Sequence, residues 1–120
     1  MKQYGIIRPD PTLQSNLMAF GYECNDGWYS LIEELLDKIQ AIVDKTPEIK
    51  DLEVLQIKEK YASLRVYLSY ETDEISDLIE EYTKKSTITC EVCGEPGSVR
   101  EDRHWYKTLC HKHFEEWIKH

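Results

Sequence analysis

The chain has 120 residues, of which 41% are hydrophobic and 32% are charged, a composition typical of one small globular domain with a single modest core. The formal net charge is −8, and residues 1–85 carry −7 of it. An acidic surface repels phosphate at long range, so the composition argues against broad nucleic-acid binding. It favours either plain solubility or a face that recognises a basic partner protein.

The N-terminus does not resemble a signal peptide, because Arg8, Pro9, Asp10 and Pro11 interrupt its apolar residues. No segment reaches the length of a membrane span. We therefore expect a cytoplasmic protein without a membrane anchor. Cysteines stay reduced in that compartment, so the four cysteines are interpreted as metal ligands before disulfides.

Residues 28–44 are predicted to form an amphipathic helix, because apolar residues recur there at spacings of three and four. Asn25 or Asp26 is the expected N-cap, and Pro47 prevents the helix from continuing. The predicted apolar stripe consists of Trp28, Leu31, Ile32, Leu35, Leu36, Ile39, Ile42 and Val43.

Residues 52–60 and 63–70 alternate in the manner of two β-strands and are predicted to form a hairpin. No glycine lies between them, so we expect a turn longer than two residues. Two strands alone are marginally stable, so a third strand is expected from the N-terminal segment or from a partner chain.

A second helix is predicted over residues 73–85, capped by Thr72 or Asp73. The expected fold class is α+β: a helix–hairpin–helix layer followed by a small treble-clef-like zinc-binding unit. The first part comprises residues 1–85 and includes an irregular N-terminal segment. The zinc-binding unit comprises residues 86–120 and packs on it.

The C-terminal unit contains the strongest motif, because Cys90 and Cys93 are spaced so that two thiolates can turn toward one ion. Gly94 then permits a tight turn with positive φ. Cys110 lies where a helix begins, and His113 shares its face three residues later. These four residues predict a closed tetrahedral zinc site with a structural role, since no position stays open for water.

Three aromatic residues of this unit, Trp105, Phe114 and Trp117, are predicted to form its small core rather than a ligand platform. The isolated Cys24 is predicted to be a partly buried thiol. Few apolar residues accompany the zinc ligands, so we expect the unit to depend on the metal for its fold.

Lys58, Lys60 and Arg65 form a basic cluster on the predicted hairpin, and Lys58 and Arg65 are expected to face each other across the strands. Such a cluster can hold a carboxylate or a phosphate. The alternative is that these side chains form salt bridges with Glu53, Glu59 and the acidic helices.

Three motifs share one pattern with known sequences. They are a Gly-Trp helix start at Gly27, a Gln-x-Lys-Glu-Lys-aromatic hairpin from Gln56 with Leu-Arg from Leu64, and a Cys-x-x-Cys-Gly-x-Pro-Gly knuckle from Cys90 closed by Leu-Cys-x-x-His from Leu109. Over roughly residues 20–115, these motifs resemble a family of small uncharacterised proteins from bacteria and their phages. Ala62 and Ser63 stand where members of the family often have glycine. The resemblance brings no established activity and implies a bacterial or phage setting.

No catalytic motif stands out, so we favour a non-enzymatic protein-binding or regulatory protein with a structural zinc ion, such as an inhibitor of a host defence factor. The alternative is a nucleic-acid-associated zinc module. A third hypothesis, an HNH-like nuclease, follows from His104 beside Asp102. The stretch between Cys93 and Cys110 is short for the metal finger of such an enzyme, and the negative net charge does not suit an enzyme that cuts DNA. The nucleic-acid alternative requires four basic residues on one side of the zinc unit: Arg100, Arg103, Lys107 and Lys112.

Overall fold

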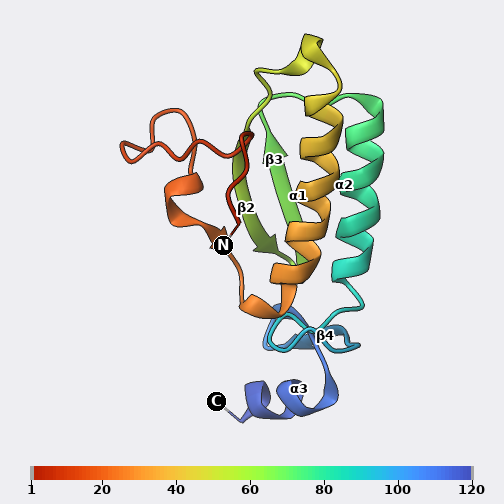
Figure 1. Cartoon of the computed structure of the whole chain (residues 1–120). Helices are drawn as coiled ribbons and strands as arrows, with labels where there is room; N and C mark the ends of the chain where they lie inside the picture. The colour runs from red at the N-terminus through yellow and green to blue at the C-terminus, as the bar shows by residue number, and fades with distance from the viewer. Residues whose placement is uncertain (1, 120) are drawn as a thin grey trace.

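A computed structural model describes residues 2–119 and shows an elongated α+β structure with extents of 49, 30 and 24 Å. A three-stranded sheet and two long helices form its larger part. A two-stranded sheet and a short helix form a C-terminal unit (residues 87–119) at one end (Figure 1). The predicted α+β class is confirmed, as is the order of loop, hairpin and helix in the C-terminal unit.

Helix α1 spans Tyr29–Asp44 and buries the predicted apolar stripe against the sheet. A 3₁₀ turn, Asp26–Trp28, precedes it, and Trp28 occupies the N-cap position. Neither helical segment has a side-chain cap, so the predicted cap at Asn25 or Asp26 is wrong. The 3₁₀ turn separates those two side chains from the first N–H groups of α1. A further 3₁₀ turn, Pro47–Ile49, follows the helix.

Strands β2 (Val54–Lys60) and β3 (Ser63–Leu68) form the predicted antiparallel hairpin. An irregularity between Val54 and Gln56 shifts the register by one residue. A β-bulge of this kind moves the following side chains to the opposite face of the sheet. As a result Val54 and Ile57 are both fully buried, although simple alternation would place them on opposite faces.

The turn between β2 and β3 contains two residues, Tyr61 and Ala62, with φ of 52° and 68°. Positive φ at both central positions is the signature of a type I′ turn, which matches the twist of a hairpin. The predicted longer turn is therefore wrong. Glycine is only the preferred solution at such positions, and here Ala62 is held in place by the burial of its side chain.

Strand β1 (Tyr22–Glu23) supplies the third strand and runs parallel to β2, beside Ile57 and Lys58. Of the two sources expected for a third strand, the N-terminal segment and a partner chain, the N-terminal segment supplies it. A 3₁₀ turn, Met18–Phe20, precedes it. The rest of the N-terminal segment is irregular and bonds to β2 through backbone groups, since the N–H of Val54 donates to Ile6 and that of Leu17 donates to Leu55.

Helix α2 spans Asp73–Ser86, and Thr72 caps it by accepting a hydrogen bond from the N–H of Ile75. Helices α1 and α2 lie side by side on one face of the sheet (Figure 1). The buried Tyr82 joins them by donating a hydrogen bond to Glu34 at 2.6 Å. The two helices contain nine carboxylates and three lysines, so they account for −6 of the net charge.

The C-terminal unit consists of β4 (Ser98–Asp102), β5 (Trp105–Leu109) and α3 (His111–Ile118). Its hairpin also has a two-residue turn with positive φ, at Arg103 and His104. Phe114 and Trp117 are half-buried and pack together, whereas 73% of Trp105 is exposed. The prediction that Trp105 belongs to a small core is therefore wrong, because successive residues at the start of β5, Trp105 and Tyr106, are both exposed.

Candidate metal centre

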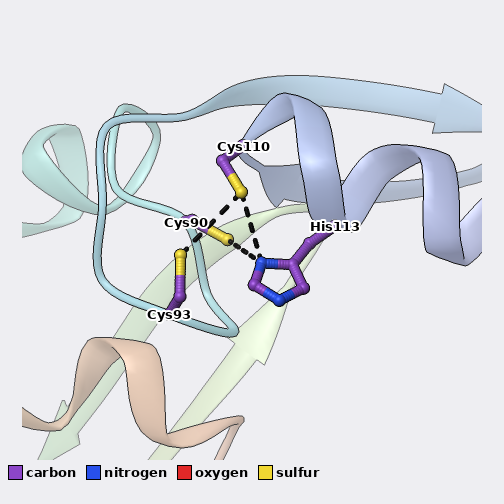
Figure 2. A group of neighbouring side chains, drawn as sticks. All are labelled: Cys90, Cys93, Cys110 and His113. Atoms are coloured by element: carbon purple, nitrogen blue, oxygen red, sulfur yellow. Dashed lines mark hydrogen bonds between the residues drawn. The ribbon is translucent and has the colours of Figure 1, made fainter.

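Four side chains that lie up to 23 residues apart converge on one point: Cys90, Cys93, Cys110 and His113. Their ligand atoms all lie within 4.8 Å of one another. Figure 2 shows the two cysteines of the loop facing Cys110 at the start of α3 and His113 on its first turn. The described residues contain no second cluster of this kind, and the four predicted ligands could hold a metal ion together.

Three of the six distances between these atoms are close to those around a tetrahedral ion. Bonds of ~2.3 Å to sulfur and ~2.0 Å to nitrogen place two sulfurs about 3.8 Å apart and sulfur about 3.5 Å from nitrogen. The Sγ atoms of Cys93 and Cys110 are 3.8 Å apart. Nδ1 of His113 lies 3.6 Å from Sγ of Cys90 and 3.2 Å from Sγ of Cys110. The four side chains could therefore hold one metal ion, and Cys₃His is a donor set that zinc prefers.

The loop around Cys90 and Cys93 is shaped by its own backbone. The N–H of Gly94 donates to the carbonyl of Cys90 at 2.9 Å, and the N–H of Cys90 donates to Glu95 at 2.7 Å. Gly94 has φ of 81°, as its position after the second cysteine predicts. A side chain on Gly94 would also approach the carbonyl of Gly27, 3.1 Å from its Cβ. Glycine is therefore required there for both conformation and space.

The two cysteines of the loop differ in how readily they ionise. Although burial acts in the other direction, backbone N–H groups of Cys110, Cys93 and Val92 lower the pKa of the Cys90 thiol to about 6. The N–H of Glu95 lowers the pKa of Cys93, but burial and the neighbouring sulfurs of Cys90 and Cys110 outweigh it and raise that pKa. Three thiolates repel one another, so a bound cation is needed to keep all three ionised.

His113 turns Nδ1 toward the sulfurs, while its Nε2 lies 3.9 Å from a carboxylate oxygen of Glu116 one helical turn later. A carboxylate beside the outer ring nitrogen helps to orient a histidine ligand. His111 is exposed and points away to Glu115, at 3.1 Å. Only one of the two neighbouring histidines therefore belongs to the cluster, as the helical spacing predicts.

The cluster is attached to the larger part of the molecule through the start of α1. The indole N–H of the fully buried Trp28 donates to the carbonyl of Thr89 at 2.8 Å. The N–H of Gly27 donates to the carbonyl of Glu91 at 2.8 Å. The sequence marks Gly27 and Trp28 only as a helix start. The structure shows that they are the docking residues of the metal-ligand loop.

A second attachment joins the two hairpins. The hydroxyl of the buried Thr108 donates to the carbonyl of Ala62 at 2.6 Å, and the carbonyl of Thr108 accepts the N–H of Glu91 at 2.9 Å. The turn of the β2–β3 hairpin, strand β5 and the metal-ligand loop are thus connected through one residue. Threonine in a strand gives no sequence signal for such a role, so the contact could not be predicted.

The basic cluster of the hairpin is assembled as its alternation suggests, since Lys58 and Arg65 pair directly across β2 and β3. Within residues 2–119, none of the basic cluster (Lys58, Lys60 and Arg65) forms an ion pair. Glu53 pairs with Arg8, and Glu59 accepts the N–H of Ala62. The alternative that these basic side chains are neutralised by salt bridges is therefore wrong.

Of the four basic residues of the nucleic-acid alternative, Arg100 packs against an aromatic ring of the C-terminal unit. The guanidinium of Arg100 lies 4.9 Å from the ring centre of Phe114, and it donates to the carbonyl of Leu109. Arg100 is thus part of the packing between β4 and α3.

Cys24 is half-buried as predicted, and burial raises its pKa to about 12.

Comparison with known proteins gives no relatives: no family model, no curated protein and no solved structure matches the chain. Within the described residues, no helix combines the length and apolar character needed to cross a membrane. The function must therefore be inferred from the site and from the surfaces around it.

Proposed function

We propose that the chain is a non-enzymatic binding protein whose C-terminal unit is a treble-clef-like module built on one structural zinc ion. The observation that carries this proposal is the composition of the cluster. Cys90, Cys93, Cys110 and His113 provide the four ligands of a tetrahedral ion, so no position remains for a water or a substrate. A closed site stabilises a fold, whereas catalytic zinc needs an open position.

The partner proposed for this protein is a basic protein that binds the acidic face of the two helices. Glu74 and Asp77 are exposed on α2, and within residues 2–119 they form no ion pair or side-chain hydrogen bond. Their charges are thus available, unlike those of Glu80 and Glu81, which pair with lysines on the same helix. Complementary charges on two partners raise the rate of association and make binding more specific.

The resemblance of the Gly-Trp, hairpin and knuckle motifs to bacterial and phage proteins supports a setting in the bacterial cytoplasm. There the protein would act as a regulator or as an inhibitor of a host defence factor. A basic target such as a nucleic-acid-binding protein fits the acidic helices.

The test compares the wild-type chain with Glu74→Gln/Asp77→Asn as bait in bacterial lysate. The control, Glu48→Gln/Glu95→Gln, removes two exposed charges elsewhere and leaves the net charge matched. We expect the wild type and the control to retain one basic partner in stoichiometric amount, and the α2 variant to lose it. Equal retention by both variants would exclude the acidic face, and the absence of any stoichiometric partner would exclude the binding function.

Zinc content is measured on the same preparations. One equivalent per chain in reduced, untagged protein is expected. An equivalent of a different metal would contradict the assignment of zinc, and less than about half an equivalent of any metal would contradict a structural site.

A further inference from the structure

We propose that the cleft between the β2–β3 turn and the β4–β5 hairpin binds single-stranded nucleic acid. This site goes beyond the proposed protein-binding function, because residues of the β2–β3 and β4–β5 hairpins line it and residues of the acidic helices do not. The cleft has a volume of about 620 Å³, within the range of ligand sites. Its lining includes three lysines and three aromatic residues that could contact the ligand: Lys58, Lys60, Lys107, Tyr61, Trp105 and Tyr106.

The lysines leave the cleft with an unneutralised positive charge. Lys58 and Lys60 alternate on one face of β2, and Arg65 stands opposite Lys58 on the same face. None of the lining lysines forms an ion pair within the part of the chain that the structure describes. Glu59 is the one carboxylate in the lining, and it accepts the N–H of Ala62 in the turn. A phosphate backbone is the complement of such a wall.

The aromatic residues are exposed at the same place. The exposed fractions of Tyr61 and Trp105 are 71% and 73%, and Tyr106 is also exposed. Tyr106 shares a face of β5 with Thr108, whose hydroxyl bonds to Ala62, so this face is directed toward the β2–β3 turn. Exposed aromatic rings beside lysines are the arrangement on which unpaired bases stack, while the lysines hold the phosphates.

Two-residue turns with positive φ lie on both sides of the cleft. Tyr61 and Ala62 form one, and Arg103 and His104 form the other. The hydrogen bond from Thr108 to Ala62 joins the two hairpins at 2.6 Å. The backbone that carries the rings and lysines is therefore ordered before a ligand binds, which lowers the entropic cost of binding.

The net charge of −8 does not oppose binding at this position. The two helices account for −6 of it, and they cover the face of the sheet on which Ile57 is buried, whereas the basic cluster alternates onto the other face. Salt largely screens exposed charges that are separated by more than the Debye length, which is about 8 Å at physiological ionic strength. Carboxylates on the solvent side of the helices therefore act weakly on the cleft, whereas the lysines of its lining act at contact distance.

An acidic peptide is also negatively charged, so it is the alternative ligand for this cleft. Lysines attract carboxylates and phosphates alike, so the charges of the lining do not distinguish the two ligands, and the aromatic residues must do so. Three exposed rings beside point charges correspond better to bases and phosphates than to short acidic side chains. The observations therefore favour nucleic acid, and an oligoglutamate peptide becomes a competitor in the test.

The experiment titrates the zinc-loaded full chain into fluorescently labelled oligo-dT and oligo-rU of about 12 nucleotides, at about 50 and about 200 mM salt. The test variant is Lys58→Ala/Lys60→Ala. The matched control is Lys45→Ala/Lys50→Ala, which removes two exposed charges at the opposite end of α1 and in the loop after it. We expect the test variant to lose at least about tenfold in affinity and to reduce the salt slope by about 0.7 per lysine, while the control matches the wild type.

A second variant tests stacking without damaging the turn. Tyr61→Asn removes the ring, and asparagine tolerates the positive φ of that position. We expect affinity to fall at least about fivefold with unchanged thermal stability. The intrinsic fluorescence of Trp105 should be quenched by the oligonucleotide, and Trp105→Phe should remove the quenching while retaining most of the affinity.

Three outcomes would overturn the proposal. The first is no binding to either oligonucleotide at the lower salt concentration, where phosphate affinity is greatest. The second is an equal loss of affinity in both lysine variants, which would indicate general electrostatic attraction to the protein and no specific binding site. The third is displacement by oligoglutamate at the same concentration as by unlabelled oligo-dT. A preference between dT and rU tells which nucleic acid is the ligand, and the partner of the acidic helices is tested separately.

Discussion

Gly27 and Glu91 are in contact through their backbones: the N–H of Gly27 donates to the carbonyl of Glu91 at 2.8 Å, and a Cβ on Gly27 would lie 2.4 Å from that same oxygen. The carbonyl oxygen of Glu91 is a backbone atom, so it cannot move aside as the end of a flexible side chain could. The start of α1 and the metal-ligand loop therefore approach as closely as two backbones can, and any side chain at residue 27 must separate them.

Gly27→Ala is expected to lower the free energy of unfolding by about 3 kcal/mol, because two backbone segments must shift and a docking hydrogen bond is lost. Gly5→Ala is the control, since its Cβ would meet only the side chain of Gln40, at 3.6 Å, and it should change stability by less than about 0.5 kcal/mol. Urea unfolding followed by circular dichroism measures both. Equal stability of the two variants would show that the approach of Gly27 to Glu91 can relax without cost.

Removal of the metal is expected to unfold the C-terminal unit while the helices and the larger sheet persist. The unit buries few apolar residues, and α3 has no fully buried side chain. Amide hydrogen exchange before and after chelation should therefore show loss of protection in β4, β5 and α3, and retained protection in α1 and β2.

Cys93→Ser should reproduce the effect of the chelator, because it removes one ligand of the cluster. Cys24→Ser is the matched control, since Cys24 lies outside the cluster and should leave both metal content and protection unchanged. Full protection of β4 and β5 in chelated protein would mean that this hairpin is stable without the ion.

Glu91 should make stability depend on pH. Its side chain is only 3% exposed, one oxygen accepts the N–H of Asn25, and the other has no partner among the described residues. Burial raises the pKa of this carboxyl above its ordinary value of 4.5, although Asn25 and Lys107 act in the opposite direction. The folded state then binds more protons than the unfolded state, so the free energy of unfolding falls as pH rises from 4.5 through the folded-state pKa.

Glu91→Gln removes this titration, and it should stabilise the protein at neutral pH relative to the wild type. The difference in stability between the two proteins should shrink as the pH approaches 5 from above, roughly the range set by the ordinary carboxyl pKa. Comparing the two proteins cancels the loss of metal affinity that acid causes in both. A difference that stays constant from neutral to acidic pH would show that the Glu91 carboxyl does not titrate in this range.

The turn of the β4–β5 hairpin holds Arg103 at φ of 53° and His104 at φ of 73°. Replacement by Asn-Gly, the preferred pair for a type I′ turn, should raise the free energy of unfolding by about 1 kcal/mol. The same pair at Lys45 and Thr46, where no positive φ is needed, should destabilise the protein. Thermal unfolding measures both variants, and an unchanged midpoint for Arg103→Asn/His104→Gly would indicate that the native pair is not strained.

The parts that the sequence predicts well depend on local periodicity or on spacing. The apolar stripe of α1 and the cap of α2 at Thr72 follow from helical geometry, and the cluster of Cys90, Cys93, Cys110 and His113 follows from the spacing of ligands around a tetrahedral ion. Each signal lies within a few residues of chain or is required by the geometry of one ion.

The features that escaped prediction depend on tertiary contacts between distant residues. Ala62 adopts positive φ because its burial and the hydrogen bond from Thr108 hold it there. Neither the burial nor the hydrogen bond can be recognised from the sequence of the turn, which contains no glycine. Gly27 has no conformational peculiarity in its own segment, so its contact with Glu91 becomes apparent only in three dimensions. The bulge after Val54 also leaves no clear mark in an alternating strand.

The separation of acidic helices from the basic cluster on the sheet makes the molecule an electric dipole, with its moment running from the helices toward the strands. A charged macromolecule that approaches through water would experience a torque before contact and would arrive already turned toward the face of opposite sign. Chromatographic media of both signs should retain the chain at the same neutral pH, each through a different side of the molecule.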